Sequence, residues 1–138
     1  MVAEVEDNNL GDEVWTTRFK RWHTCDLCKQ DYHGVVRCAL GWACWKTYVG
    51  RPERNWSRRA AMTELGNGLY NAIHHEAALP VREAELAMRR RLGDSEEELL
   101  VVQGNLAGTY QALGRHEDAL RMRQNVYSRR LKLNGEER

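Results

Sequence analysis

The pattern of apolar and polar residues predicts four amphipathic helices in the C-terminal two-thirds of the chain. Apolar side chains recur there at steps of three and four residues, the spacing of one helix face. Breakers and caps separate these segments at Gly93-Asp94-Ser95, at Gly114 and at Asn134-Gly135. We therefore expect helices over about 56–73, 76–92, 95–113 and 116–133.

The four helices form two similar units, because the sequence repeats after 41 residues. The shift superposes Leu65 on Leu106, His75 on His116 and Ala78 on Ala119. A period of this length, with one helical hairpin in each unit, is typical of an α-solenoid. Small residues within the repeat are expected where paired helices approach closely.

The second unit carries residues at the positions that shape such a hairpin. They are Leu106, Ala107, Tyr110, Gly114, Glu117, Ala119 and Leu120. With them, the segment 105–137 resembles a tetratricopeptide repeat of the kind found in kinesin light chains. The first unit matches less well, because Ile73 stands at the position of the turn glycine and Pro80 lies early in the second helix. The resemblance covers about residues 57–138 and implies a protein-binding scaffold.

The expected fold is therefore mainly α, a short array of tetratricopeptide-like helical hairpins. Such arrays usually need about three units to bury a continuous core. Two hairpins with no closing helix leave an apolar face uncovered at the C-terminal end. We expect either a longer array or coverage of this face by another protein, self-association included.

The segment 15–50 differs in kind, because it holds all four cysteines and four of the five tryptophans. A Cys-x2-Cys pair on a tight turn can place two thiolates on one edge of a zinc ion. We expect one structural Zn²⁺ bound by Cys25, Cys28, Cys38 and Cys44. A segment of about 40 residues rarely folds on a hydrophobic core alone, and metal binding can supply the missing stability.

The residues after the first cysteine pair suggest how the second pair would be placed. Val35-Val36 is a short β-prone run that ends near Cys38, and Cys44 falls in a predicted helix. This order resembles a treble-clef zinc finger over about residues 22–48. Two alternatives stay open: His33 or His23 replaces one thiolate, or Cys38 and Cys44 are plain core residues without a metal.

Aromatic and basic residues beside this module have structural interpretations. Trp42 and Trp45 lie on one stripe of a short helix, and we expect it to pack the module onto the first repeat helix near Trp56. The alternative is an exposed platform for a ligand. The run Arg89-Arg90-Arg91 is expected to be a solvated helix end, where positive charge suits the helix dipole.

Composition divides the chain and limits its surroundings. Residues 1–14 are acidic and expected to be a disordered lead-in, followed by the cysteine-rich module 15–50 and the hairpins 51–138. The 138 residues carry 21 basic and 20 acidic side chains, so no general attraction to nucleic acid or a membrane is expected. No secretory signal or membrane-length apolar run is present. A cytoplasmic protein with reduced thiols is expected.

The expected function is a non-enzymatic adaptor, in which a zinc finger caps a hairpin array whose groove binds a peptide or a partner helix. The candidate contacts, on the first helix of each hairpin and the turn after it, are Asn67, Asn71, Asn105, Thr109 and Arg115. In an alternative, the finger recruits a ubiquitin-transfer enzyme or nucleic acid and the helices are a spacer. A catalytic pair such as Cys44 with His33 would need a larger scaffold, so no enzymatic activity is expected.

Overall fold

The computed structural model describes residues 12–135, and the regular elements in this range are helical. They are α2 (Asp12–Phe19), the 3-10 turn η1 (Lys20–Trp22), α3 (Gly34–Tyr48), α4 (Trp56–Asn71), α5 (His75–Arg91), α6 (Glu96–Ala112) and α7 (His116–Gly135). An isolated β-bridge joins Thr24 and Asp31. The mainly α fold is confirmed, and none of the described helices is long and apolar enough to cross a membrane.

The four helices expected from the apolar pattern are α4 to α7, and local caps set where two of them begin. The first N–H groups of a helix have no partner within it, so a side-chain oxygen before the helix stabilises its start. Asn55 accepts from the backbone N–H of Arg58 at 3.1 Å, and Ser95 accepts from that of Glu98 at 3.3 Å. Three glutamates in the first turn of α6 also complement the helix dipole.

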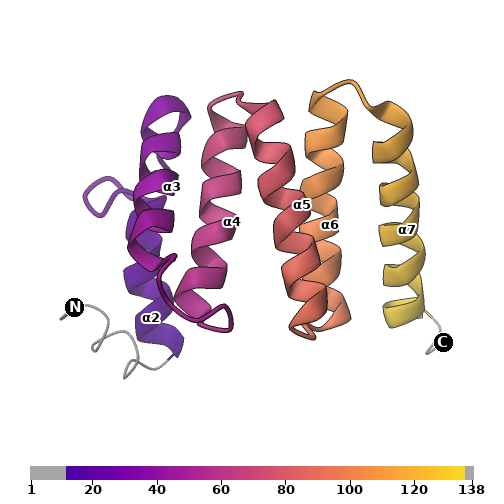
Figure 1. Cartoon of the computed structure of the whole chain (residues 1–138), viewed down its shortest axis with the longest axis horizontal. Helices are drawn as coiled ribbons and strands as arrows, with labels where there is room; N and C mark the ends of the chain where they lie inside the picture. Colours follow the sequence, from indigo (N-terminus) through magenta and orange to yellow (C-terminus); the bar gives the residue numbers. More distant parts are fainter. Residues whose placement is uncertain (1–11, 136–138) are drawn as a thin grey trace.

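Helices α3 to α7 stand side by side in chain order, each antiparallel to the next, with α2 and α3 at one end and α7 at the other (Figure 1). Three buried clusters lie between neighbouring helices. The first joins Phe19, Cys44, Tyr48 and Ala61, the second Leu65, Leu69 and Ala78, and the third Leu86, Val102 and Leu106. The core is thus a series of helix–helix contacts along the row.

The 41-residue repeat is visible in how the two hairpins turn. The N–H of His74 donates to the carbonyl of Leu69 at 2.8 Å, and the N–H of Arg115 donates to that of Tyr110 at 2.8 Å. The residue before each of these donors has a left-handed backbone. Its φ is 65° at Ile73 and 78° at Gly114. Both turns therefore have the same αL-type helix ending, one with glycine and one without.

We expect the substitution Ile73→Gly to stabilise the protein by about 1 kcal/mol, because a β-branched side chain is strained at positive φ. Ile73 is 76% exposed, so little buried area is lost. Urea unfolding measures the effect, and Gly114→Ala in the equivalent turn is the matched control, expected to destabilise. A lower urea midpoint for Ile73→Gly would contradict this explanation.

The cysteine-rich segment does not form the hairpin expected of a treble-clef finger. Val35 and Val36, for which a β-strand was predicted, lie in the first turn of α3, with 80% and 53% of their surface exposed. Intrinsic strand preference is weak and yields to tertiary contacts. Here α3 makes the most extensive helix–helix contact described, with α4. The predicted hairpin is wrong, and α3 packs directly on α4, which lies on the other side of the predicted boundary near residue 51.

The N-terminal end of the described residues also differs from the expected disordered lead-in. Helix α2 begins at Asp12, so residues 12–14 are helical, and residues 1–11 lie outside the described range. The indole N–H of Trp15 donates to the Ser57 hydroxyl at 2.9 Å, and the Trp15 ring stacks on Phe19 with centroids 4.8 Å apart. The bond from Trp15 to Ser57 joins α2 to α4.

The aromatic stripe packs on α4 in part. Trp45 packs against the first two core clusters, and Tyr48 is buried. Trp42 remains 43% exposed and Trp56 63% exposed, with the Arg59 guanidinium 4.9 Å from the Trp56 ring. The prediction of a stripe packed onto the first repeat helix is therefore confirmed for Trp45, whereas Trp42 stays partly exposed and Trp56 does not form the expected contact surface.

Candidate functional site

The first cysteine pair lies on a tight turn between η1 and α3. The N–H of Lys29 donates to the carbonyl of Cys25 at 2.9 Å, and the N–H of Cys25 donates to that of Gln30 at 2.9 Å. Lys29 has φ 62°, which lets the chain reverse within these few residues. The Thr24–Asp31 bridge closes the base of the loop.

This turn stabilises a thiolate at Cys25. The backbone N–H groups of Cys28 and Leu27 donate to the Cys25 sulfur, and the Cys28 thiol does so too. These hydrogen bonds lower the pKa of Cys25 below its usual value, because they favour the charged form. Cys28 is exposed to solvent. The pair is therefore accessible and suited to metal ions or electrophiles.

Cys38 and Cys44 lie inside the helical packing instead. Cys44 is fully buried in the first core cluster, where burial and the nearby Glu64 carboxylate raise the pKa of its thiol. Cys38 packs against the second cluster. A buried neutral thiol is a poor nucleophile, so this position does not suit the Cys44–His33 catalytic pair.

The four cysteines do not meet at one point. Cys38 and Cys44 are six residues apart on α3, which separates them by about 9 Å along the axis and about 240° around it. Two ligands of a tetrahedral zinc lie only about 3.7 Å apart. Within residues 12–135 no three cysteine, histidine or acidic side chains gather as they would around a metal ion, including at His33 and His23.

Three of the expected groove residues make contacts within the protein. The Asn67 side chain accepts from the Arg82 guanidinium at 3.0 Å, and that of Asn71 accepts from the N–H of Gly34 at 2.6 Å. Thr109 is completely buried, so its assignment as a partner contact is wrong. It was assigned by helix face alone, and that face is covered.

The other two groove candidates lie along α6 and the turn that follows it. Asn105 is half-buried, and its carbonyl accepts from the hydroxyl of Thr109 at 3.3 Å. Arg115 is exposed, with its guanidinium 4.5 Å from the Tyr110 ring and its Nε 2.9 Å from the Asp118 carboxylate. Of the five candidates, Thr109 alone is buried; Asn71 and Arg115 are exposed, and Asn67 and Asn105 are half-buried.

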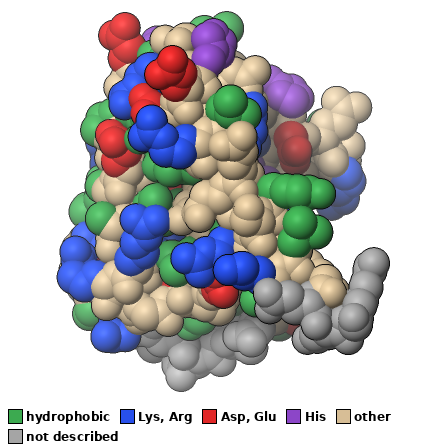
Figure 2. Space-filling model, turned by 90° about the vertical axis from the view of Figure 1, so that its right-hand side faces the viewer, with side chains coloured by type: hydrophobic (Ala, Val, Ile, Leu, Met, Phe, Trp, Pro, Cys, Tyr) green, Lys and Arg blue, Asp and Glu red, His purple; other side chains and the backbone are tan. Residues whose placement is uncertain are grey.

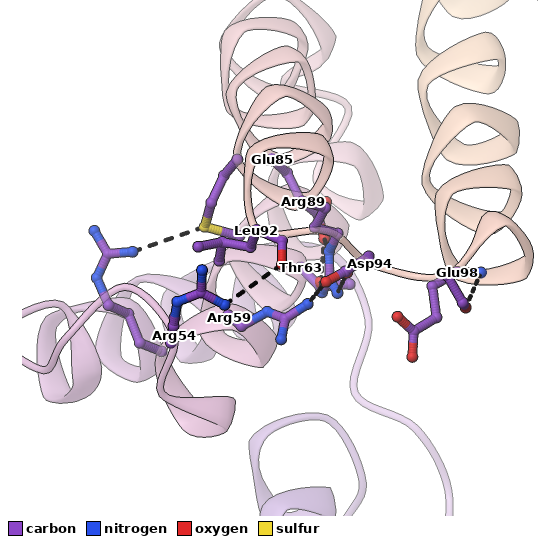
Figure 3. Close-up of polar contacts among 11 residues, drawn as sticks. Arg54, Arg59, Thr63, Glu85, Arg89, Leu92, Asp94 and Glu98 are labelled. Carbon is purple, nitrogen blue, oxygen red and sulfur yellow. Dashed lines mark hydrogen bonds and ion pairs between the residues drawn. The ribbon is translucent and has the colours of Figure 1, made fainter.

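A buried charge network joins α4, α5 and the turn before α6 (Figure 3). Arg89 donates to Glu85 at 3.1 Å, to Asp94 at 3.0 Å and to the Thr63 hydroxyl at 3.1 Å. Arg59 pairs with the other oxygen of Asp94, and Thr63 donates to Glu85. Glu85 has no exposed surface, and burial lowers the pKa of Arg59. The prediction that Arg89 belongs to a solvated helix end is therefore wrong.

A second buried arginine lies nearby on α5. Arg82 is 4% exposed, and its guanidinium contacts Asn67 and lies 5.7 Å from the Tyr70 ring. Burial lowers its pKa, while the Glu85 charge opposes that shift. These buried charges hold α4 and α5 together, so we regard them as structural.

The outer face of α7 carries apolar side chains that no described helix covers. Leu120, Tyr127 and Leu131 lie on one stripe and are 58%, 67% and 51% exposed. The repeat places Leu120 on Leu79 and Tyr127 on Leu86 of α5. Leu86 is only 5% exposed, because Val102 and Leu106 of α6 cover it together with Leu79.

Comparison with known proteins finds no match. No family model fits the chain, and no curated protein or solved structure is significantly similar to it.

Charge distinguishes the two ends of the α7 face. Its first turn carries Glu117 and Asp118, whereas its last turns carry Arg129, Arg130 and Lys132. Figure 2 shows this end of the molecule, with Lys and Arg side chains over its lower half and most Asp and Glu side chains above them. A pocket of about 250 Å³, lined in part by Val101, Arg130 and Leu133, opens between the start of α6 and the end of α7.

Sequence reasoning had expected an uncovered face here but not the residues that form it. Leu120 was assigned only to the repeat signature, and Tyr127 and Leu131 were not selected. The signal was available in the repeat itself, because each residue can be compared with its equivalent 41 positions earlier. What was missing was the observation that α6 covers the equivalent face of α5.

Proposed function

We propose that this chain is a non-enzymatic protein-interaction module of the tetratricopeptide kind, and that it binds its partner through the outer face of α7. One observation carries the proposal. Leu120 and Tyr127 are exposed, whereas their equivalents Leu79 and Leu86 are covered by the next helix. Contiguous exposed apolar surface of this kind typically marks an interaction site.

The partner we propose is an amphipathic α-helix that lies antiparallel to α7. Helix α6 supplies the template, because it covers the equivalent face of α5 with an aliphatic stripe. It also begins with Glu96, Glu97 and Glu98, one short turn after the three arginines that end α5. The partner helix would likewise begin with an acidic turn beside Arg130 and Lys132, where opposite charges favour one orientation.

The groove on the first helices is a weaker candidate for the same function. Asn67 and Asn71 already accept hydrogen bonds from Arg82 and Gly34, and Thr109 is buried. A peptide that accepted or donated at these side chains would share them with contacts that join α3, α4 and α5. The α7 face offers apolar area without this cost.

The proposed module acts in the cytoplasm. All four cysteines are free in the structure, which suits a reducing compartment.

A labelled peptide with the sequence of residues 94–113 is the probe for this face, since it copies α6. We expect it to bind the full chain in a fluorescence anisotropy titration. Leu120→Glu should weaken binding at least tenfold, because burying a leucine contributes about 1.5–3 kcal/mol. Val35→Glu, at an exposed apolar site on α3, is the control and should bind like the wild type.

Two results would overturn this proposal. One is peptide binding that Leu120→Glu and Tyr127→Glu leave unchanged. The other is a wild-type dimer, seen by light scattering, that either substitution dissociates, since a second copy would then be the occupant of the face. Circular dichroism of both variants checks that the helical fold is retained, as expected for side chains more than half exposed.

A further inference from the structure

The loop that carries Cys25 and Cys28 has the form of one half of a metal site. Two backbone hydrogen bonds close its turn, one from Lys29 to Cys25 and one from Cys25 to Gln30. The positive φ of Lys29 lets the chain reverse there. A Cys-x2-Cys pair on such a turn can place two thiolates on one edge of a tetrahedral zinc.

The pair is accessible from outside the helical row. Cys28 is exposed and Leu27 is 94% exposed. The loop projects beyond α3 on the side away from α4 (Figure 1). Another molecule can therefore approach both sulfurs without displacing a helix.

The rest of the coordination sphere has to come from elsewhere. Zinc takes four ligands, and the described residues assemble no group of three. Cys38 and Cys44 pack into the helical core, and the Nδ1 atom of His23 lies 2.9 Å from the Thr24 hydroxyl. A second copy of the chain carries an identical pair, with Cys28 exposed and Cys25 half-buried, and two such pairs related by a two-fold axis make four thiolates.

We propose that Cys25 and Cys28 form a two-thiolate half-site for a thiophilic divalent cation such as Zn²⁺, completed by the same pair of a second copy. One ion binds two chains, and the four thiols release four protons as four metal–sulfur bonds form. The complex is a dimer joined at the loop. This inference is independent of the α7 face, which lies at the other end of the row.

Titration of the reduced full-length chain with Zn²⁺, followed by native mass spectrometry and light scattering, tests the proposal. We expect one metal ion per two chains and a shift from monomer to dimer. Cys28→Ser should abolish both. Cys38→Ala should leave both unchanged, and circular dichroism shows whether either variant has lost the helical fold. Co²⁺ in place of Zn²⁺ reports thiolate coordination by its absorption.

Other stoichiometries would overturn the proposal. One ion per monomer, lost equally in Cys28→Ser and Cys38→Ala, would mean a single four-cysteine site in each chain. One ion per monomer lost only in Cys28→Ser would mean that the second copy supplies no ligand. If no Zn²⁺ binds in competition with a weak chelator, the two cysteines do not form a metal site. None of these results bears on peptide binding at α7.

Discussion

Replacing Arg89 by methionine is expected to destabilise the protein by roughly 3–5 kcal/mol, because it leaves a buried carboxylate without its charge partner. Glu85 has no exposed surface, and Arg89 is the cation that contacts it, at 3.1 Å. The same arginine donates to Asp94 and Thr63, so one substitution breaks contacts among α4, α5 and the turn before α6. Urea unfolding followed by circular dichroism measures the loss.

The neighbouring arginine provides the matched control. Arg90 follows Arg89 on α5 but is exposed, so Arg90→Met should change the free energy of unfolding by less than about 0.5 kcal/mol. The double variant Arg89→Met/Glu85→Met should recover a large part of the loss, because replacing a whole buried ion pair by apolar residues is often nearly neutral. Equal losses in the single and double variants would contradict this account.

Gly68→Ala is expected to destabilise by about 1–3 kcal/mol through steric overlap between α3 and α4. A Cβ at Gly68 would lie 2.7 Å from the Arg37 carbonyl oxygen and 3.0 Å from the Cα of Cys38. Gly41 faces α4 in the same way, where a Cβ would lie 2.8 Å from the Glu64 carbonyl oxygen. Since these are backbone atoms, relief requires that the two helices move apart. Thermal unfolding gives the size of the effect.

A third glycine separates this steric effect from helix propensity. A Cβ at Gly104, within α6, would meet nothing within 4 Å. Gly104→Ala should therefore stabilise by about 0.5–1 kcal/mol, because alanine loses less backbone entropy in a helix. If Gly68→Ala stabilises the protein by a similar amount, the close approach of α3 and α4 is not a constraint.

The helices α4 to α7 could be predicted because their evidence is local. Apolar residues at helical spacing, the cap at Ser95 and the breakers Gly93 and Gly114 act within a few residues of where they stand. The repeat added a comparison between units, and it correctly identified Ile73 as the residue in the position of a turn glycine. Each of these signals depends on backbone geometry that one segment determines for itself.

The candidate site was predicted less well, because burial of polar groups depends on distant partners. Arg89 had been expected in solvent and Thr109 on an open groove, yet both pack inside the row. A pattern of apolar and polar residues predicts an exposed position for any charged residue. Only the meeting of Arg89 with Glu85, Asp94 and Thr63 from different elements makes its burial favourable.

By itself, the sequence determined the four C-terminal helices, their pairing into two related hairpins, and a tight turn at Cys25 and Cys28. Tertiary structure alone decided that Val35 and Val36 enter a helix, because α3 packs closely along α4 where Gly41 approaches Glu64 and Gly68 approaches Arg37. That choice also decided where the other cysteines point. Six residues in one helix turn Cys44 away from Cys38, whereas a hairpin followed by a helix would have brought them together.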